Sequence, residues 1–283
     1  PLIGHAEIIE KLSKYEIIAA MRERTPFSRE TLQQLPNLRL IVTTGMRNGA
    51  IDLSAAIEFG ITVSGTNGSG IDTAELTWGL IFSLLRNIPR EDAALRAGIW
   101  QTSIGTGLYG KTLGVLGLGR LGTPVAAIGK AFGMKVIAWS QNLTENKARD
   151  AGVNLVSKND LFIRSDILTI HVVLSERTRG LIGLNELQLM KPSSYLINTS
   201  RGPIVDETAL IHSLNLGTIR GAGIDVYDKE PLPLNHPLTK LNNTVLTPHL
   251  GYVTHEAYRV FYEETIEDIV AFINGTPIRI LGS

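Results

Sequence analysis

Short runs of β-branched and other apolar residues alternate with amphipathic stretches in the first quarter of the chain. The runs are YEIIAAM, LRLIVTTG and ITVSGT, and the stretches between them are SRETLQQLP and DLSAAIEFG. This alternation is typical of βαβ units with a parallel sheet. Ahead of them, PLIGHAEIIEKLSKY predicts a loop and a helix with no strand and no initiator Met. We therefore expect a small α/β domain in a processed or truncated chain that lacks an opening strand.

A second and longer series of strand-like runs begins at TLGVLGLG and continues to NTVLTP. The runs between these two are KVIAWS, NLVS, ILTIHVV, SYLINTS and RGAGIDVY, and helix-like segments separate most of them. Strands that are almost continuously apolar are typical of parallel sheets buried on both faces. The series therefore predicts a larger, doubly wound parallel sheet.

Two helix-like segments mark where the chain passes between the predicted domains. TAELTWGLIFSLLRNIP is apolar on most faces, which indicates a buried helix, and THEAYRVFYEETIEDIVAFING is long, amphipathic and ended by Gly275. We expect the second segment to return to the small domain. The predicted division is residues 1–73 and 254–283 for the small domain and residues 74–253 for the large one.

The composition narrows the class of protein. The 283 residues include 27 basic and 27 acidic side chains, so no charge excess favours nucleic acid or an anionic membrane as a partner. The chain has no cysteine, which excludes disulfides and thiolate metal sites, and we expect no metal site. The longest apolar run is much shorter than the roughly 20 residues of a membrane span. We expect a cytoplasmic protein.

The segment GLGRLG, Gly117 to Gly122, matches the G-x-G-x-x-G pattern of dinucleotide-binding loops. A strand-like run precedes it, and a helix-compatible run and another strand follow within about thirty residues. Gly117 would allow a tight turn, Gly119 would let the backbone approach a pyrophosphate, and Gly122 would let helix and strand pack closely. Amides at the helix start, including those of Arg120 and Leu121, would bind the phosphates. The competing interpretation is a glycine-rich turn without a ligand.

Three further stretches carry polar side chains directly after predicted strands: INTSRGPIVDE, GAGIDVYDKEP and LTPHLG. Ligands of open α/β sheets bind outside the carboxyl ends of the strands. We therefore expect the guanidinium of Arg201, the carboxylate of Glu230 and the imidazole of His249 to lie close together at this edge of the sheet. Taken singly, each has a structural interpretation: a surface ion-pair partner, a loop carboxylate and a core histidine.

In these motifs the sequence resembles the D-isomer-specific 2-hydroxyacid dehydrogenase family over nearly its whole length. The resemblance rests on GLGRLG, HVVLSERTRGLIG, NTSRGPIVDE, DVYDKEP and TPHLG, in the family's order and at about its spacing. It implies a Rossmann-type doubly wound parallel sheet with a second, smaller, discontinuous flavodoxin-like α/β domain. It also implies an oxidoreductase that transfers a hydride between NAD(P)H and a small 2-keto acid or D-2-hydroxy acid, such as glyoxylate or hydroxypyruvate.

The resemblance places the family's catalytic residues on Arg201, Glu230 and His249. Arg201 is expected to clamp the carboxylate and the carbonyl oxygen of the keto acid, because its planar guanidinium suits paired oxygen acceptors. His249 is expected to protonate the carbonyl oxygen as the hydride arrives. Glu230 is expected to bond the other ring nitrogen, fix the tautomer and favour the charged ring.

The resemblance also assigns binding positions outside the triad. Asp225 resembles the family's acceptor for the nicotinamide carboxamide, and Thr199 lies near the same ring. The loop TTGMRNGAID, with Gly45, Met46 and Arg47, resembles the substrate loop, whose amides hold the carboxylate, although many members have a glycine-valine-glycine turn there. Arg47 either adds a cation near the substrate or faces the solvent. The residues do not decide between these alternatives.

The acid that usually binds the adenosine ribose is missing from the stretch KVIAWSQN. The resemblance places it at Ser140. An aspartate there would accept hydrogen bonds from both ribose hydroxyls and repel a 2′-phosphate. Ser140 removes that repulsion. No cation that could bind the 2′-phosphate follows it directly, because the nearest ones in sequence are Lys147 and Arg149. We expect NADP to be accepted, with NAD also used.

Other interpretations stay open. His171 either touches the cofactor or packs in the core, and a dinucleotide-sensing corepressor would share the fold and the triad but show little turnover. A formate dehydrogenase would carry glutamine in place of Glu230, and phosphite oxidation is a rarer alternative. We expect a small-molecule substrate and a homodimer in which the segment from Arg90 to Tyr109 reaches across to the partner.

Overall fold

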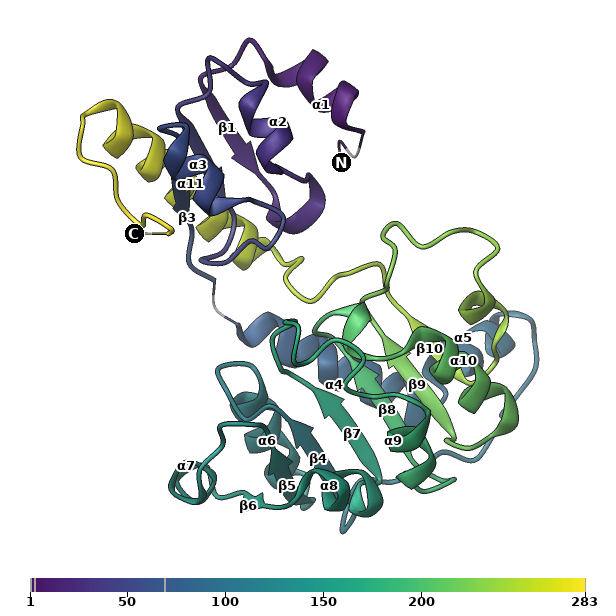
Figure 1. The fold of residues 1–283 in the computed structure, drawn as a ribbon. Coiled ribbons are helices and arrows are strands. Elements are labelled where there is room, and N and C mark those ends of the chain that lie inside the picture. Colours follow the sequence, from purple (N-terminus) through teal and green to yellow (C-terminus); the bar gives the residue numbers. More distant parts are fainter. Residues whose placement is uncertain (1, 3, 69, 283) are drawn as a thin grey trace. The chain divides into compact units, whose positions relative to one another are not determined.

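Residues 2, 4–68 and 70–282 are described in the computed structural model, and the chain divides into two units. One unit comprises residues 1–69 and 254–283, and the other comprises residues 70–253 (Figure 1). The first division lies just before helix α4 (Ile71–Leu85), so the boundary expected between residues 73 and 74 falls inside this helix. Each unit has its own parallel sheet and its own apolar core.

The unit formed by both ends of the chain contains a three-stranded parallel sheet in the order β1-β2-β3. Its strands are β1 (Ile17–Ala20), β2 (Leu40–Thr43) and β3 (Thr62–Gly65), and its helices are α1 (His5–Leu12), α2 (Arg29–Gln33), α3 (Leu53–Glu58) and α11 (His255–Ile273), with a 3-10 turn at Arg22–Arg24. The side chains of Ser28, Asp52 and Thr254 cap α2, α3 and α11 by accepting backbone N–H groups. The long helix α11 therefore completes a domain that residues 1–69 begin.

The other unit contains a seven-stranded parallel sheet in the order β10-β9-β8-β7-β4-β5-β6. Its strands are β4 (Thr112–Leu116), β5 (Lys135–Trp139), β6 (Asn154–Leu155), β7 (Ile167–Ile170), β8 (Tyr195–Asn198), β9 (Gly221–Ile224) and β10 (Thr244–Leu246). Its helices are α4, α5 (Ile88–Arg96), α6 (Gly122–Ala131), α7 (Glu145–Asp150), α8 (Lys158–Arg164), α9 (Leu184–Leu189) and α10 (Glu207–Leu216), with 3-10 turns at Gly202–Ile204 and Pro237–Lys240.

The strand order reverses direction between β4 and β7. The chain moves outward from β4 to β5 and β6, then returns to the other side of β4 for β7 and continues to β10. This reversal is the topological switch point of a doubly wound sheet, where such folds bind their ligands.

Alternate side chains of the large sheet face two different helix layers. Leu168 and Ile170 pack in one core cluster with residues of α8, α9 and α10, whereas Ile167 and Ile197 pack in the other with residues of α4 and α6 (Figure 1). Because both faces are covered, the strands carry apolar residues at nearly every position. This explains the nearly continuous apolar runs in the sequence.

The end of strand β7 differs from the sequence expectation. The strand stops at Ile170, so His171, although it belongs to the run ILTIHVV, is the first residue beyond the strand. The amide of His171 still donates to the carbonyl of Leu116 in β4, at 2.7 Å. His171 is therefore fixed at the carboxyl edge of the sheet.

The segment from Arg90 to Tyr109 begins inside a helix that has no clear apolar period in the sequence. Helix α5 runs to Arg96, and only the residues after it are irregular. No side chain of α5 is buried, so an apolar period could not reveal the helix.

Within the described residues, no helix is both long enough and apolar enough to cross a membrane.

Candidate active site

The carboxyl ends of the seven parallel strands lie along one edge of the large sheet. The glycine loop 117–122 follows β4, the segment 199–201 follows β8, the segment 225–230 follows β9, and the segment 247–251 follows β10. All of them belong to one unit. Parallel pairing thus places the motifs along a common edge, although up to about 130 positions separate them in the sequence.

His249 and Glu230 form the most direct contact of this edge. His249 Nδ1 lies 2.6 Å from Glu230 Oε2, and Glu230 Oε1 accepts the amide of Tyr227 at 3.0 Å. Burial opposes ionisation of Glu230, but the hydrogen bond and charge of His249, the Tyr227 amide and the charge of Arg201 together hold its pKa below the ordinary value. An ionised carboxylate can only accept, so Nδ1 carries the proton. Nε2 has no hydrogen-bond partner among the described residues.

Arg201 is placed by the turn that follows β8. Its backbone carbonyl accepts from Asn198 Nδ2 at 3.0 Å, and its Nη1 donates to the carbonyl of Ser200 at 2.7 Å. The charge of Arg201 acts on the carboxylate of Glu230, so the guanidinium lies near the Glu230–His249 pair. A guanidinium carries five N–H donors, enough to bond its own backbone and a substrate carboxylate together.

Asp225, which is 1% exposed, fixes the loop that carries His249. Its Oδ1 accepts from Thr247 Oγ1 at 2.6 Å and from the Leu250 amide at 2.7 Å, and its Oδ2 accepts from the Gly251 amide at 2.9 Å. Burial raises the pKa of Asp225 although these bonds oppose the shift. His249 itself has φ 57°, in the left-handed region, where a non-glycine residue needs support from its surroundings. The role of Asp225 toward a carboxamide stays a prediction.

The glycine loop has the shape that a dinucleotide requires. A Cβ on Gly117, whose φ is 102°, would lie 2.8 Å from the backbone of His171, and a Cβ on Gly122 would collide with the carbonyl of Gly117. A Cβ on Gly119 would meet nothing within 4 Å, so the space beside this exposed glycine is open. Helix α6 begins here, and its first amides have no intrahelical acceptor. The loop therefore fits a pyrophosphate, with the amides of Arg120 and Leu121 beside it.

Ser140 lies next to this loop because β5 is paired with β4. Trp139 is opposite Leu116, and the carbonyl of Trp139 accepts the amide of Gly117 at 2.9 Å. Ser140 is the next residue and is partly exposed. The expected position for the ribose contact is thus beside the glycine loop.

A buried pair of hydroxyls adds a residue that the sequence did not single out. Thr199 Oγ1 lies 2.9 Å from Thr77 Oγ1 of helix α4, and Thr77 donates to the carbonyl of Thr73 at 2.8 Å. Thr77 stands in the apolar stretch LTWGL, where nothing in the local pattern distinguishes it from the core. Helix α4 therefore supplies the wall beside Thr199.

The expected substrate loop follows β2 in the other unit. Gly45, with φ 92°, donates its amide to Thr66 Oγ1 at 2.9 Å, and Asn48 Nδ2 bonds Thr43 Oγ1 at 2.8 Å. The amides of Met46 and Arg47 have no hydrogen-bond partner among the described residues. Both side chains are exposed. The loop is thus fixed at its base and has two available donors at its tip, whereas the amide of Gly45 is already occupied.

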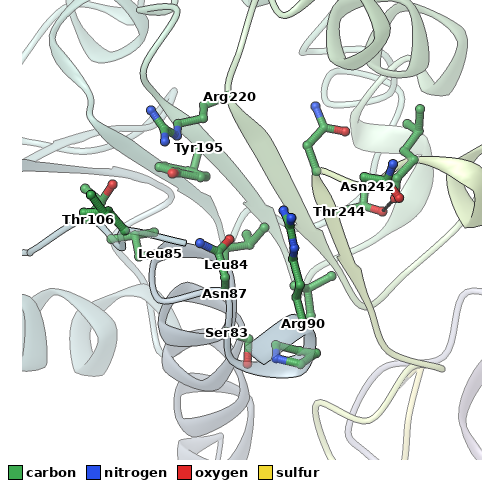
Figure 2. Close-up of a pocket in the computed structure, with 15 residues that line it drawn as sticks. Ser83, Leu84, Leu85, Asn87, Arg90, Thr106, Tyr195, Arg220, Asn242 and Thr244 are labelled. Carbon is green, nitrogen blue, oxygen red and sulfur yellow. Dashed lines mark hydrogen bonds between the residues drawn. The ribbon is translucent and has the colours of Figure 1, made fainter. Parts of the chain in front are cut away.

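A cavity of about 630 Å³ lies at the opposite, amino-terminal edge of the large sheet. Figure 2 shows Tyr195, Arg220 and Thr244, from the starts of three neighbouring strands, together with Asn87 and Arg90 near the start of α5. None of the expected site residues lines it. The cavity is separate from the carboxyl edge that carries the expected site residues.

Known proteins resemble this chain in sequence and in structure. A family model described as the NAD binding domain of D-isomer specific 2-hydroxyacid dehydrogenases matches residues 78–251. The glyoxylate reductase of Aeropyrum pernix is 41% identical over 256 residues, which cover 87% of this chain and 76% of that protein. The match of the family model includes the glycine loop and all three residues of the expected triad.

Two solved structures resemble this one and contain a cofactor. The D-lactate dehydrogenase of Aquifex aeolicus, complexed with NAD and lactic acid, has a TM-score of 0.84 and 30% identity over 95% of this chain and 86% of that one. An acyclic imino acid reductase in complex with NADPH and D-Arg has a TM-score of 0.83 and 30% identity over 98% of this chain and 89% of that one. The predicted α/β fold and family are confirmed. This chain belongs to the D-isomer specific 2-hydroxyacid dehydrogenase family.

Proposed function

We propose that this chain, an NAD(P)-dependent oxidoreductase of 2-hydroxy acids, reduces a small 2-keto acid such as glyoxylate or hydroxypyruvate, with His249 as the proton donor. The observation that carries the proposal is the 2.6 Å contact between His249 Nδ1 and Glu230, beside Arg201 at the carboxyl edge of the sheet. The bound dinucleotide supplies the hydride for the carbonyl carbon. The same groups catalyse the reverse oxidation.

His249 holds the proton that the carbonyl oxygen receives. Because Nδ1 is bonded to the anionic Glu230, Nε2 is the nitrogen that gives up its proton to the substrate. Glu230 stabilises the charged ring before transfer and keeps its orientation afterwards. In the reverse direction the neutral Nε2 takes the hydroxyl proton.

Arg201 orients the substrate. A planar guanidinium can bond the carboxylate and the carbonyl oxygen of a 2-keto acid in one plane, which fixes the carbonyl carbon and polarises the carbonyl bond. We propose that the amides of Met46 and Arg47, in the loop that Gly45 begins, bind the same carboxylate. Their free donors and the resemblance to the family's substrate loop support this assignment.

The cofactor is assigned to the glycine loop, with Gly117, Gly119 and Gly122 shaping the backbone and Arg120 and Leu121 offering amides to the pyrophosphate. We also assign the nicotinamide carboxamide to Asp225 and the space near the same ring to Thr199. Each oxygen of Asp225 has two lone pairs, so the bonds to its own loop do not exclude a further donor.

The function is tested by turnover. The purified chain is mixed with NADH or NADPH and with glyoxylate, hydroxypyruvate, pyruvate or larger 2-keto acids, and oxidation of the cofactor is followed at 340 nm as a function of substrate. We expect saturable oxidation with at least one small keto acid. Tight cofactor binding without turnover on the whole panel would instead support the dinucleotide-sensing corepressor.

Cofactor choice depends on Ser140. Ser140 carries no charge that would repel a 2′-phosphate, so we expect NADPH to be used, with NADH also accepted. Ser140→Asp should shift the ratio of kcat/KM toward NADH by about tenfold or more, which corresponds to roughly 1.4 kcal/mol. Ser140→Ala, which removes the hydroxyl without adding charge, is the matched control and should change the ratio much less. Strict use of NADH by the wild type would contradict the assignment.

We further propose a homodimer located in the cytoplasm, where reduced dinucleotides are supplied. The resemblance to the family and the exposure of the segment after α5 support the dimer. This segment presents large apolar side chains to solvent: Ile99, Trp100, Ile104 and Tyr109, of which Ile104 is 90% exposed. Ile104 also lines the cavity at the amino-terminal edge. A second copy would cover this surface.

A further inference from the structure

Four polar side chains form a buried patch below the carboxyl ends of β7 and β8, on the face that α4 covers. They are Thr77, Thr169, His171 and Thr199, and each is 8% exposed or less. Thr77 bonds Thr199, and Thr169 Oγ1 lies 2.9 Å from His171 Nε2. Strands β7 and β8 are neighbours in register, with Ile170 opposite Asn198. His171 and Thr199 directly follow these two paired residues, so they lie side by side.

His171 has one ring nitrogen bonded and one without a partner. Its Nδ1 is buried and has no hydrogen-bond partner among the described residues. Burial lowers the pKa of His171 to about 4, so the ring is neutral at physiological pH. Leaving a buried polar atom unpaired costs about 1–3 kcal/mol, and native proteins rarely leave such atoms without a partner. The free nitrogen points to a ligand.

The position of His171 suggests which ligand. A Cβ on Gly117 would lie 2.8 Å from the carbonyl carbon of His171 and the amide of Val172, so the residue stands directly behind the first glycine of the cofactor loop. Thr199, beside it, is two residues from Arg201. The patch thus lies between the phosphate-binding loop and the catalytic triad, below the part of the edge that a dinucleotide must cross to reach both.

We propose that His171 binds the cofactor through Nδ1, as a neutral hydrogen-bond group for the ribose–pyrophosphate part of the dinucleotide. This inference rests on the proposed use of NADH or NADPH. If the hydroxyl of Thr169 donates to Nε2, the ring proton resides on Nδ1, which then donates to a cofactor oxygen. Thr169 thereby selects the tautomer of the His171 ring.

A role in core packing alone makes a different prediction. In that role the bond from Nε2 to Thr169 is the one to preserve, and the free Nδ1 is irrelevant. Glutamine places a polar atom near the position of Nε2, whereas asparagine places one near Nδ1. His171→Gln and His171→Asn therefore separate the two roles, and His171→Leu removes both polar atoms.

The test measures cofactor binding without substrate. The wild-type chain and the three variants are titrated with NADH and with NADPH, and Kd is obtained from the nicotinamide fluorescence. Urea unfolding of the same samples reports their stability. We expect His171→Asn to stay within about threefold of the wild-type Kd. We expect His171→Gln and His171→Leu to weaken binding by about tenfold, the effect of losing one hydrogen bond of roughly 1.4 kcal/mol.

Equal Kd values for all four proteins, or better binding by His171→Gln than by His171→Asn, would overturn the inference. A wild type that binds neither dinucleotide would overturn the proposed function itself, which is a different result. If the variants fail to fold, the ring nitrogens of ¹⁵N-histidine-labelled wild type serve instead, with the His171 signals identified by their displacement in Thr169→Val. NADH should displace the Nδ1 signal, and an unchanged signal in a protein that binds NADH would contradict the contact.

Discussion

At the scale of single residues, the proposed chemistry depends on His249, which is held from two sides. Glu230 fixes its ring, and Asp225 holds the loop on either side of it, by accepting from the hydroxyl of Thr247 and the amide of Leu250. The left-handed φ of His249 is tolerated because these contacts determine the path of the loop. Replacement of His249 must therefore separate the loss of a proton donor from the relaxation of the backbone.

Kinetic analysis at two positions separates orientation of the substrate from donation of the proton, and asparagine at position 249 limits relaxation of the backbone. Arg201→Ala should raise KM and lower kcat together, because the clamp acts on both the bound substrate and the transition state. His249→Asn should act chiefly on kcat, by about 10²–10⁴-fold, since asparagine tolerates a left-handed backbone but cannot donate the proton. Keto-acid reduction by the His249 variant within about twofold of wild type would refute its role as proton donor.

The neutral His171 also predicts a pH dependence of stability. Its pKa is about 4 in the folded chain and 6.5 in a model compound, so between these values the unfolded chain binds the proton and the folded chain does not. The free energy of unfolding is therefore unaffected by the titration of His171 above pH 6.5. It falls as the pH is lowered toward 4, by an amount on the order of 3 kcal/mol. Urea unfolding at pH 7.5, 5.5 and 4.5 should therefore show a steeper loss for wild type than for His171→Asn. Parallel curves would contradict this account.

At the scale of elements, the glycine loop contains glycines with two different roles: Gly119 leaves space for a ligand, and Gly122 allows close packing. Gly119→Ala should fold normally, because its methyl group meets open space, but should weaken dinucleotide binding by about tenfold or more since that space is needed by the ligand. Gly122→Ala should instead cost about 1–3 kcal/mol of stability, because its methyl group collides with the carbonyl of Gly117. Urea unfolding and NADPH titration of both variants check this; loss of stability in Gly119→Ala would contradict it.

Elements with a strong pattern were predictable from the sequence, whereas contacts between distant elements were not. Parallel strands buried on both faces leave continuous apolar runs, so the two parallel sheets and the placement of the motifs after their strands could be predicted. Helix α5 was missed because none of its side chains is buried. The contact of Thr77 with Thr199 joins positions 122 residues apart, and the bonds of Asp225 reach 22 to 26 residues onward. No local period encodes such distances.

At the scale of the whole molecule, the exposed segment after α5 predicts the oligomeric state. Glu91 Oε2 accepts the amide of Thr102, and its Oε1 accepts the hydroxyls of Thr102 and Ser103. The bonds from Ser103 and Thr102 lower the pKa of Glu91 to about 2, so the anchor is ionised at physiological pH. The segment is thus held in place while its apolar side chains face solvent, as expected of a surface prepared for a partner.

Light scattering tests the dimer. We expect twice the mass of the 30.8 kDa chain for wild type and a single-chain mass for Trp100→Glu, because Trp100 is 80% exposed and would place the charge inside the interface. Leu234→Glu is the matched control, since Leu234 is 96% exposed but lies outside the segment, and it should leave the mass unchanged. If the wild type has the mass of a single 30.8 kDa chain at working concentration, the proposed dimer is wrong.

The bonds made by Asp225 have a consequence for how far this sequence can diverge. Two of its three donors are backbone amides, at Leu250 and Gly251, and any residue except proline supplies an amide. Position 250 can therefore vary widely without loosening the loop, whereas position 225 needs a short carboxylate with two accepting oxygens. In a collection of active variants, substitutions should accumulate at Leu250 and be nearly absent at Asp225, even though Leu250 lies directly beside the histidine in the chain.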